Sequence, residues 1–159
     1  MKITIIAVGK IKESYFKGAI EEYSKRLSKY CKLEIIEVAD EKTPDGAGET
    51  VCDMIREKEA QRICRYIRED AYVISLAILG RQMDSVAFSE KIESLGIRGI
   101  SHIQFIIGGS LGLHESVLKR SDAQLSFSEM TFPHQLMRVI LLEQIYRAYR
   151  IIAGEPYHK

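Results

Sequence analysis

A glycine-rich turn follows a strongly apolar segment in the second half of the chain. Residues 102–107 read His-Ile-Gln-Phe-Ile-Ile, and residues 108–112 read Gly-Gly-Ser-Leu-Gly. In open α/β sheets ligands bind beyond the carboxyl ends of the strands, where glycine lets backbone amides approach closely. The turn matches neither the phosphate loop Gly-x-x-x-x-Gly-Lys-Ser/Thr nor the dinucleotide motif Gly-x-Gly-x-x-Gly. Two interpretations therefore stay equally open: a ligand-binding turn, and a tight turn that needs glycine for its backbone alone.

Two other apolar runs end in a similar way. Leu76 to Gly80 closes one run, and Phe127 to His134 leads into the last apolar segment, with Pro133 placed for a first helical turn. Small and hydroxyl-bearing residues accompany the apolar side chains at these ends. Such a combination suits a ligand that has an aromatic ring and a ribose.

Other chemistries are disfavoured by what the sequence lacks. The four histidines do not have the close spacing of a zinc motif, and only His134 and His158 remain candidates for a functional role. A serine hydrolase is not indicated, because no Gly-x-Ser-x-Gly elbow occurs. We therefore expect no metal at the site.

The elements that must position these turns follow from hydrophobic periodicity. Runs rich in β-branched residues predict strands over residues 3–8, 33–38, 72–79, 102–107 and, more weakly, 123–127. Helical spacing predicts helices over residues 15–30, 51–67, 85–95 and 136–152. We expect Thr50 and Asp53 to cap the second helix and Asp84 the third. Strands that alternate with helices predict an α/β fold with a mostly parallel sheet and helices on both faces.

One polar segment interrupts this alternation. Residues Asp40–Glu49 combine charges with Pro44, Gly46 and Gly48, so the segment cannot bury enough apolar area to be ordered by packing. We interpret it as a mobile loop that connects two elements, and contact with a substrate is the less favoured alternative.

The last helix, over residues 136–152, is apolar on more than one face. An isolated small domain cannot hide such a helix completely, which predicts that part of it meets a partner subunit. A homodimer is the economical form, because most soluble oligomers are closed homo-oligomers. The alternative is that other helices of the same chain enclose it.

Composition limits the remaining possibilities. A chain of 159 residues that is 46% hydrophobic fits a single domain over residues 1–159. A net charge of +1 lacks the electrostatic footprint of a strongly basic nucleic-acid binder, so an RNA surface would have to be a local patch. Three cysteines without a close pair indicate a reduced, cytoplasmic compartment, and no apolar stretch is long enough to span a membrane.

Taken together, these segments resemble the RlmH-type ribosomal large-subunit (pseudouridine-N3)-methyltransferase family of the SPOUT superfamily. The similarity covers nearly the whole chain. It is carried by residues 6–10, 76–80 and 105–112, and most strongly by Met-Thr-Phe-Pro-His at 130–134, Glu-Gln-Ile-Tyr-Arg-Ala at 143–148 and Pro-Tyr-His-Lys at 156–159.

This resemblance implies a sheet whose C-terminal part forms a deep trefoil knot and binds S-adenosylmethionine in a bent form. Pattern alone would not predict a knot, because knots are nearly absent from proteins. Ala77 departs from the family, whose members often carry an acidic residue there, whereas Met130 and Phe132 keep an apolar pocket. The positions that match the cofactor site are Leu76, Gly108, Phe127, Ser128, Glu129, Met130, Thr131 and Phe132.

The family's reaction is methylation of N3 of a pseudouridine in 23S rRNA, which requires no metal. The ring nitrogen must lose a proton, so a base or charge-stabilising donors are needed nearby. We expect His134 and the tail residues Tyr157 and His158 to be catalytic, with fraying of the tail as the alternative. The expected RNA-binding residues are Arg138, Arg147, Arg150 and Lys159, although a solvated helix face explains Arg147 equally well.

The nearly neutral charge indicates an assembled ribosome, rather than naked RNA, as the substrate. Two rival functions remain. One is a SPOUT methyltransferase that acts on another RNA such as transfer RNA, and the other is a non-enzymatic α/β dimer that binds a nucleotide as a regulatory module. Binding of S-adenosylmethionine but not of ATP or NAD would separate the enzyme from the regulatory module. A purely structural protein would leave the three strand-end turns without an explanation.

Overall fold

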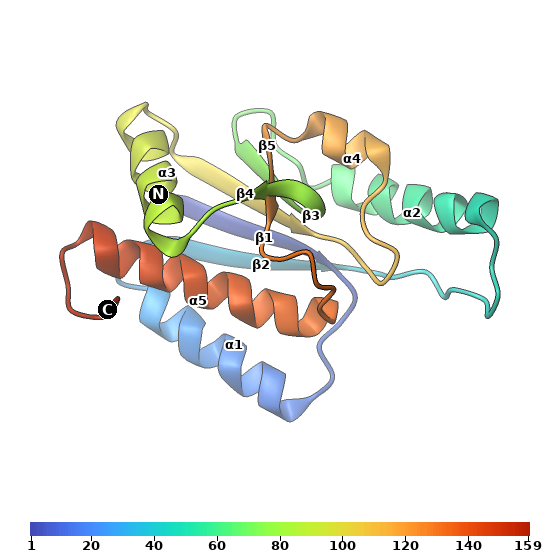
Figure 1. The fold of residues 1–159 in the computed structure, drawn as a ribbon, viewed down its shortest axis with the longest axis horizontal. Helices are drawn as coiled ribbons and strands as arrows, with labels where there is room; N and C mark the ends of the chain where they lie inside the picture. Colours follow the sequence, from blue (N-terminus) through green and yellow to red (C-terminus); the bar gives the residue numbers. More distant parts are fainter.

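A computed structural model describes all of residues 1–159 as ten elements that alternate along the chain (Figure 1). In chain order these are β1 (Lys2–Val8), α1 (Ser14–Leu27), β2 (Lys32–Val38), α2 (Glu49–Cys64), β3 (Tyr72–Gln82), α3 (Ser85–Ile97), β4 (His102–Ile107), α4 (Glu115–Arg120), β5 (Ala123–Ser126) and α5 (His134–Ile152). Every predicted strand and helix is present, and the short helix α4 follows the glycine-rich turn. No helix is long and apolar enough to cross a membrane.

The five strands form one sheet in the order β2-β1-β4-β3-β5, and every neighbouring pair is parallel. Parallel neighbours require crossover connections, which the intervening helices supply. The central strand β4 is buried along its whole length, as expected for a strand covered on both faces. The predicted α/β class and parallel sheet are therefore confirmed.

Helices cover both faces of the sheet, and alternation along β1 separates the two cores. Ile3, Ile5 and Ala7 pack with buried residues of α1, α3 and α5, whereas Ile6 and Val8 pack with α2 and α4. This separation follows from the two-residue period of a strand, which sends successive side chains to opposite faces. Figure 1 shows α1, α3 and α5 gathered on one side and α2 with α4 on the other.

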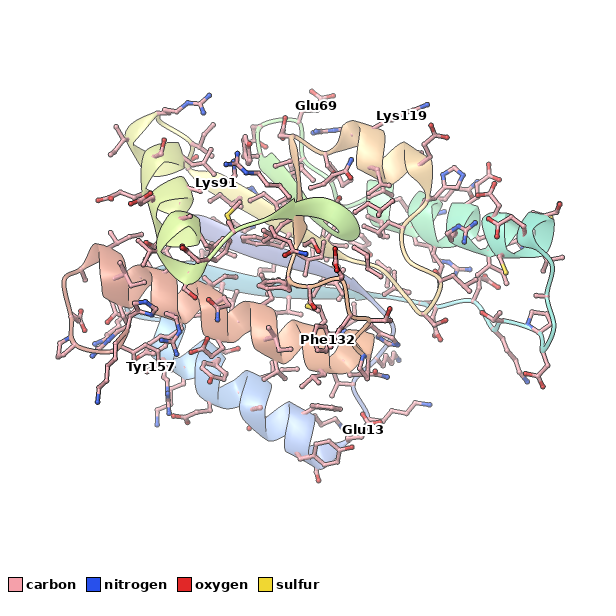
Figure 2. All side chains as sticks on the ribbon, viewed as in Figure 1. Glu13, Glu69, Lys91, Lys119, Phe132 and Tyr157 are labelled. Atoms are coloured by element: carbon pink, nitrogen blue, oxygen red, sulfur yellow. The ribbon has the colours of Figure 1, made fainter.

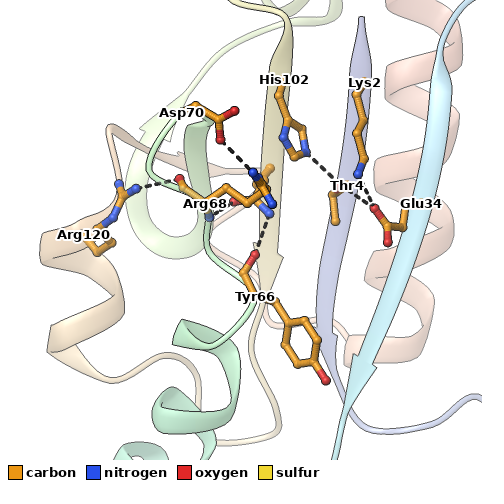
Figure 3. A network of polar contacts seen from close by, with 9 residues as sticks. Lys2, Thr4, Glu34, Tyr66, Arg68, Asp70, His102 and Arg120 are labelled. Atoms are coloured by element: carbon orange, nitrogen blue, oxygen red, sulfur yellow. Dashed lines mark hydrogen bonds and ion pairs between the residues drawn. The ribbon is translucent and has the colours of Figure 1, made fainter.

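A polar network fixes the edge of the sheet at which the strands begin, which is remote from the strand-end turns (Figure 3). The Gln104 side chain accepts a hydrogen bond from the Arg68 amide at 2.8 Å and donates to the Tyr66 carbonyl at 2.9 Å. His102 lies 2.9 Å from the Thr4 hydroxyl, between Nε2 and Oγ1. These contacts satisfy buried polar groups that would otherwise be costly, and they hold the connection before β3 against β4.

Two predicted caps have different outcomes. Asp84 accepts a hydrogen bond from the Ala87 amide at 2.8 Å and caps α3 as expected. The expected capping box of Thr50 and Asp53 is not formed, because α2 already begins at Glu49 with an extended Gly48 at its N-cap. Both residues therefore lie within the helix, where their side chains cannot reach the free amides at its start.

The polar segment over residues 40–49 has no regular structure before α2, as expected, but its beginning is held in place. The Glu41 amide donates to the buried Glu59 carboxylate at 3.0 Å, and Arg62 donates to the Ala39 carbonyl at 2.9 Å. Side chains of α2 thus provide hydrogen-bond partners for this part of the backbone. Glu41 has a fixed partner on α2, and mobility of the segment Asp40–Glu49 stays a prediction.

The apolar faces of α5 are largely covered by helices of the same chain. Leu141, Leu142 and Ile145 are fully buried, and α5 packs against both α1 and α3. Leu136, Val139 and Ile140 nevertheless stay half-buried, so contact of part of α5 with a partner subunit stays a prediction. Exposed apolar side chains occur elsewhere, at Leu79 (96% exposed) and Met130 (73% exposed).

Candidate active site

The three turns singled out in the sequence meet at one cavity of about 810 Å³, which we call the strand-end cavity. Its wall consists of residues 76–79, 107–113, 118, 124–128, 130–135 and 137. Parallel strands end at the same edge of a sheet, so turns that are distant in sequence are brought together there. The expected convergence of the strand-end turns is observed in this cavity.

The pairing of β3 with β5 becomes irregular after Leu76. Leu76 and Arg81 both pair with Leu125 of β5, so residues 77–80 form an irregular excursion between two pairings with the same residue. Gly80 makes this possible, because a Cβ atom there would lie 2.8 Å from the Gln124 carbonyl carbon. Ala77, at the position that is often acidic in the family, lies on this excursion and lines the cavity.

The glycine turn after β4 closes tightly on itself. A Cβ atom on Gly108 would lie 2.9 Å from the carbonyl carbon and oxygen of Gly112, and Gly112 itself has a φ of +81°. Only glycine fits both positions without strain. The two interpretations of this turn are compatible, because the tight backbone and the cavity wall are the same residues.

The third turn joins β5 to α5 and is stabilised by serine hydroxyls. Ser126 Oγ donates to the Ser128 carbonyl at 3.1 Å, and Ser128 Oγ accepts from the Met130 amide at 3.0 Å. Phe127, Thr131 and the other predicted cofactor residues of this turn line the cavity, with one exception. Glu129 is exposed and outside the wall, so the structure does not support a side-chain contact from it.

The cavity wall suits an aromatic ligand. Thirteen of its 24 residues are hydrophobic, and its polar character comes mainly from backbone groups, serine and threonine hydroxyls and side-chain amides. The wall contains no aspartate, glutamate, lysine or arginine, and His134 is its only titratable residue. No group of side chains in the chain could hold a metal ion. An adenosyl group would find apolar contacts and close backbone donors there.

His134 stands where α5 begins and touches the turn after β1. Its Cε1 lies 3.0 Å from the position of a Cβ on Gly9, which has a φ of +90° and so must be glycine. Its Nδ1 is buried without a hydrogen-bond partner. Burial and, next, the nearby positive charge of Arg138 lower the pKa of His134 below its usual 6.5. The imidazole is therefore neutral at pH 7 and can act as a proton acceptor.

The lowered pKa predicts an acid-sensitive site. Between its folded-state pKa and 6.5, His134 binds fewer protons in the folded than in the unfolded chain, so unfolding free energy should fall as pH drops through that range. A proton NMR titration should place the midpoint of His134 below 6.5, and His134→Gln should reduce the pH dependence of stability there. A midpoint at or above 6.5 would contradict this assignment. His102, whose pKa burial also lowers, must be followed separately.

Arg138, which we expected to bind RNA, is buried. Its side chain is 2% exposed, its Nη1 donates to Glu37 Oε2 at 2.7 Å, and its Nη2 donates to the Gly9 carbonyl at 3.1 Å. The expectation of a contact with RNA is therefore wrong for Arg138. The sequence could not reveal this, because Glu37 and Gly9 are far from Arg138 along the chain.

The C-terminal tail is anchored on α5 rather than frayed. Tyr157 donates from its hydroxyl to Glu143 Oε1 at 3.0 Å, and the Arg147 guanidinium lies 4.7 Å from the Tyr157 ring centroid. His158 Nδ1 lies 3.2 Å from Arg147 Nη1. The tail residues therefore have defined positions, which is what a functional tail requires.

The tail and the cavity are nevertheless separate within one chain. Tyr157 reaches Glu143, nine residues after His134, which corresponds to about 14 Å along the axis of α5 at the usual rise of 1.5 Å per residue. Figure 2 shows Phe132 of the cavity and Tyr157 of the tail near different ends of α5, and neither Tyr157 nor His158 lines the cavity. The three candidate catalytic residues are therefore not brought together by a single chain.

Comparison with known proteins places this architecture in a class. The chain matches the family model described as predicted SPOUT methyltransferase over residues 1–158. It is also similar over 99% of its length to a solved structure of a probable methylase family protein from Haemophilus influenzae Rd KW20, with a TM-score of 0.56, 14% identity and 70% of that chain covered. At that identity the likeness concerns the fold alone. The chain belongs to the SPOUT methyltransferase family.

Two relatives with much higher sequence identity to the chain carry the same name. A ribosomal RNA large subunit methyltransferase H from Bifidobacterium adolescentis is 65% identical over 159 residues, covering all of both chains. A protein of the same name from Clostridium kluyveri is 60% identical over the same full length. The family implies a methyl donor of the S-adenosylmethionine type.

Proposed function

We propose that this protein methylates N3 of a pseudouridine in the 23S rRNA of the large ribosomal subunit, with S-adenosylmethionine as the methyl donor. The observation that carries the proposal is the convergence of three glycine- and serine-containing turns on one mostly apolar cavity. Family membership supplies the reaction class, and the names of full-length relatives supply the substrate class. The cytoplasm is the compartment in which such a substrate is found.

The residues of the strand-end cavity fit the methyl donor. Apolar side chains such as Leu76 and Phe127 can enclose an adenine ring, while the tight turn at Gly108 leaves its backbone accessible. When bound, S-adenosylmethionine supplies an electrophilic methyl group on a sulfonium. The wall has no cation to repel that positive charge. We further infer that the chain around residues 127–133 passes through the trefoil knot of the SPOUT superfamily.

The protein's own residues would act on the pyrimidine. Positioning of the base within reach of the methyl group supplies much of the acceleration in such a displacement. N3 must lose its proton, and neutral His134 at the cavity wall is suited to accept it. Tyr157 and His158 line the base in this proposal, and no metal is needed for any step.

We propose that two chains complete one site as a homodimer, with the tail of one chain placed over the cavity of the other. The separation of Tyr157 and His158 from the cavity of their own chain supports this arrangement. Exposed Ile78, Leu79 and Met130 are apolar residues of the cavity wall that a second chain would cover.

Contacts with RNA would come from Arg147, Arg150 and Lys159. Arg147 pairs with Glu143 at 2.8 Å and Arg150 pairs with Glu155, so both have partners that RNA phosphate would have to displace. Such partly neutralised arginines bind free RNA weakly, because affinity depends on the phosphates that a protein neutralises. An assembled ribosome, which offers RNA and protein surfaces together, is the substrate that fits them.

The decisive experiment compares substrates. Purified protein with radiolabelled S-adenosylmethionine should methylate ribosomes from cells that lack the enzyme at least about tenfold faster than protein-free 23S rRNA, because a nearly neutral protein gains little from phosphate contacts and naked RNA lacks the ribosomal protein surfaces. Mapping should locate the label at N3 of a pseudouridine. Equal rates would refute the ribosome as the substrate, and label in transfer RNA would identify the rival activity. Calorimetry should show binding of S-adenosylmethionine but not of ATP or NAD.

A further inference from the structure

A cluster of polar residues lies behind one wall of the strand-end cavity, where β1 and β2 end. The Arg138 guanidinium donates to the Glu37 carboxylate and to the Gly9 carbonyl at 2.7 and 3.1 Å. The same oxygen of Glu37 accepts from the Ile11 amide at 3.1 Å. One buried side chain of α5 therefore joins the helix to β2 and to the turn after β1.

Such an arrangement needs an explanation, because a buried arginine is costly. Ion pairs that lose their water are often no more stabilising than apolar residues of the same volume. Arg138 is 2% exposed, and its Nε has no hydrogen-bond partner. An apolar side chain would avoid that unsatisfied donor, so stability alone does not account for the arginine.

The cluster is continuous with the cavity through His134. His134 and Arg138 are four residues apart on α5, so their side chains lie on the same face of the helix. Both side chains contact Gly9. The imidazole packs against the Cα of Gly9, and the guanidinium donates a hydrogen bond to its carbonyl. His134 is also part of the cavity wall, next to residues 130–133.

We propose that Arg138 is a positioning residue for the methyl transfer: with Glu37 it clamps the Gly9 turn against His134 and so fixes the first turn of α5. The adjacent wall of the methyl-donor cavity then keeps its shape. This inference rests on the proposed function, and it concerns a residue that touches neither the methyl donor nor the RNA.

Arg138 also influences the charge of His134. Burial lowers the pKa of His134 most, and Arg138 lowers it further. Asp40, which follows β2, and Glu13, which precedes α1, act in the opposite direction. Removal of the Arg138 charge should therefore raise the pKa of His134 and move the acid limb of the pH–rate profile to higher pH.

The test uses the full-length protein and three variants. Arg138→Met removes the charge and keeps most of the volume, whereas Arg138→Lys keeps the charge but cannot reach both acceptors in the same geometry. Arg56→Met is the matched control, because Arg56 is also a mostly buried, ion-paired helix residue but lies on α2, away from the cavity. Affinity for S-adenosylmethionine, the NMR titration of His134, the pH–rate profile on ribosomes and the thermal midpoint are measured for each.

We expect Arg138→Met to weaken S-adenosylmethionine binding at least about tenfold, which corresponds to about 1.4 kcal/mol, and to raise the titration midpoint of His134. Arg138→Lys should restore the His134 midpoint while recovering only part of the affinity, and Arg56→Met should change neither. A lower thermal midpoint with unchanged affinity, titration and pH–rate profile would show a merely structural role and overturn the proposal.

If Arg138→Met does not fold, Glu37→Gln is tested in its place. Glu37 is partly exposed, and the glutamine side chain has nearly the same size and shape as the glutamate. The expected result is weaker S-adenosylmethionine binding than in the wild type, and unchanged binding would overturn the proposal. Binding and titration need no RNA. A wild-type protein that binds the methyl donor but leaves ribosomes unmodified would therefore refute the proposed substrate without affecting the test of Arg138.

Discussion

A Gly108→Ala variant is expected to lose about five- to 150-fold in affinity for S-adenosylmethionine, because overpacking costs about 1–3 kcal/mol and 1.4 kcal/mol corresponds to tenfold. The added Cβ would lie 2.9 Å from the backbone of Gly112 and 3.1 Å from Leu113 Cδ2. Backbone atoms cannot rotate away as a flexible side chain can, so the turn must open. Isothermal titration calorimetry measures the effect directly.

The matched control for this variant is Gly18→Ala. Gly18 lies in the exposed part of α1, and a Cβ there meets nothing within 4 Å. That exchange should leave the affinity unchanged and raise stability slightly, because alanine favours a helix over glycine by up to about 1 kcal/mol. Gly108→Ala with wild-type affinity would show that the methyl donor does not depend on the turn after β4.

Removal of the last three residues, Tyr157 to Lys159, is expected to lower kcat on ribosomes at least about 100-fold, the usual scale for a lost proton-transfer environment. Affinity for S-adenosylmethionine should change much less, because none of the three lines the cavity of its own chain. Tyr157→Phe keeps the ring that packs on the core and removes only the hydroxyl bonded to Glu143. Single-turnover rates measure the effect on methyl transfer, and calorimetry measures the affinity for S-adenosylmethionine.

The same truncation tests the shared site. A chain without its tail keeps an intact cavity, and a Gly108→Ala chain keeps an intact tail, so a mixed dimer contains one complete site. At an S-adenosylmethionine concentration too low to fill the Gly108→Ala cavity, mixing the two impaired proteins should therefore give more activity than the sum of the separate proteins after subunit exchange. A truncated protein with a wild-type rate would show that the tail takes no part in the reaction, and a mixture no more active than that sum would refute the shared site.

Several parts of the molecule could be predicted from local pattern. Hydrophobic periodicity identified every strand and every long helix, because burial of apolar side chains has the period of the element that buries them. The cavity-lining turns could be recognised because glycine and proline restrict backbone geometry locally. The resemblance to the SPOUT family, carried by short motifs near residues 130–134 and 156–159, supplied the reaction and the methyl donor.

Local pattern failed where a distant partner decides the outcome. Arg138 has the same sequence signature as an arginine on a solvated face, and only the arrival of Glu37 and Gly9 buries it. Pattern alone also could not tell which part of the apolar surface of α5 is enclosed by α1 and α3 of the same chain. Thr50 and Asp53 did not cap α2, because the helix begins at Glu49, two residues earlier than their motif requires.

Local pattern thus suffices to predict the elements, the parallel α/β class and the turns that line the cavity, since each depends on residues close together along the chain. Folding of the whole chain sets which charges are buried, which turns share a wall and how far the tail lies from the cavity of its own chain. The physical reason is that burial and pairing are properties of the whole packed chain, whereas periodicity and backbone preference are properties of a few neighbouring residues.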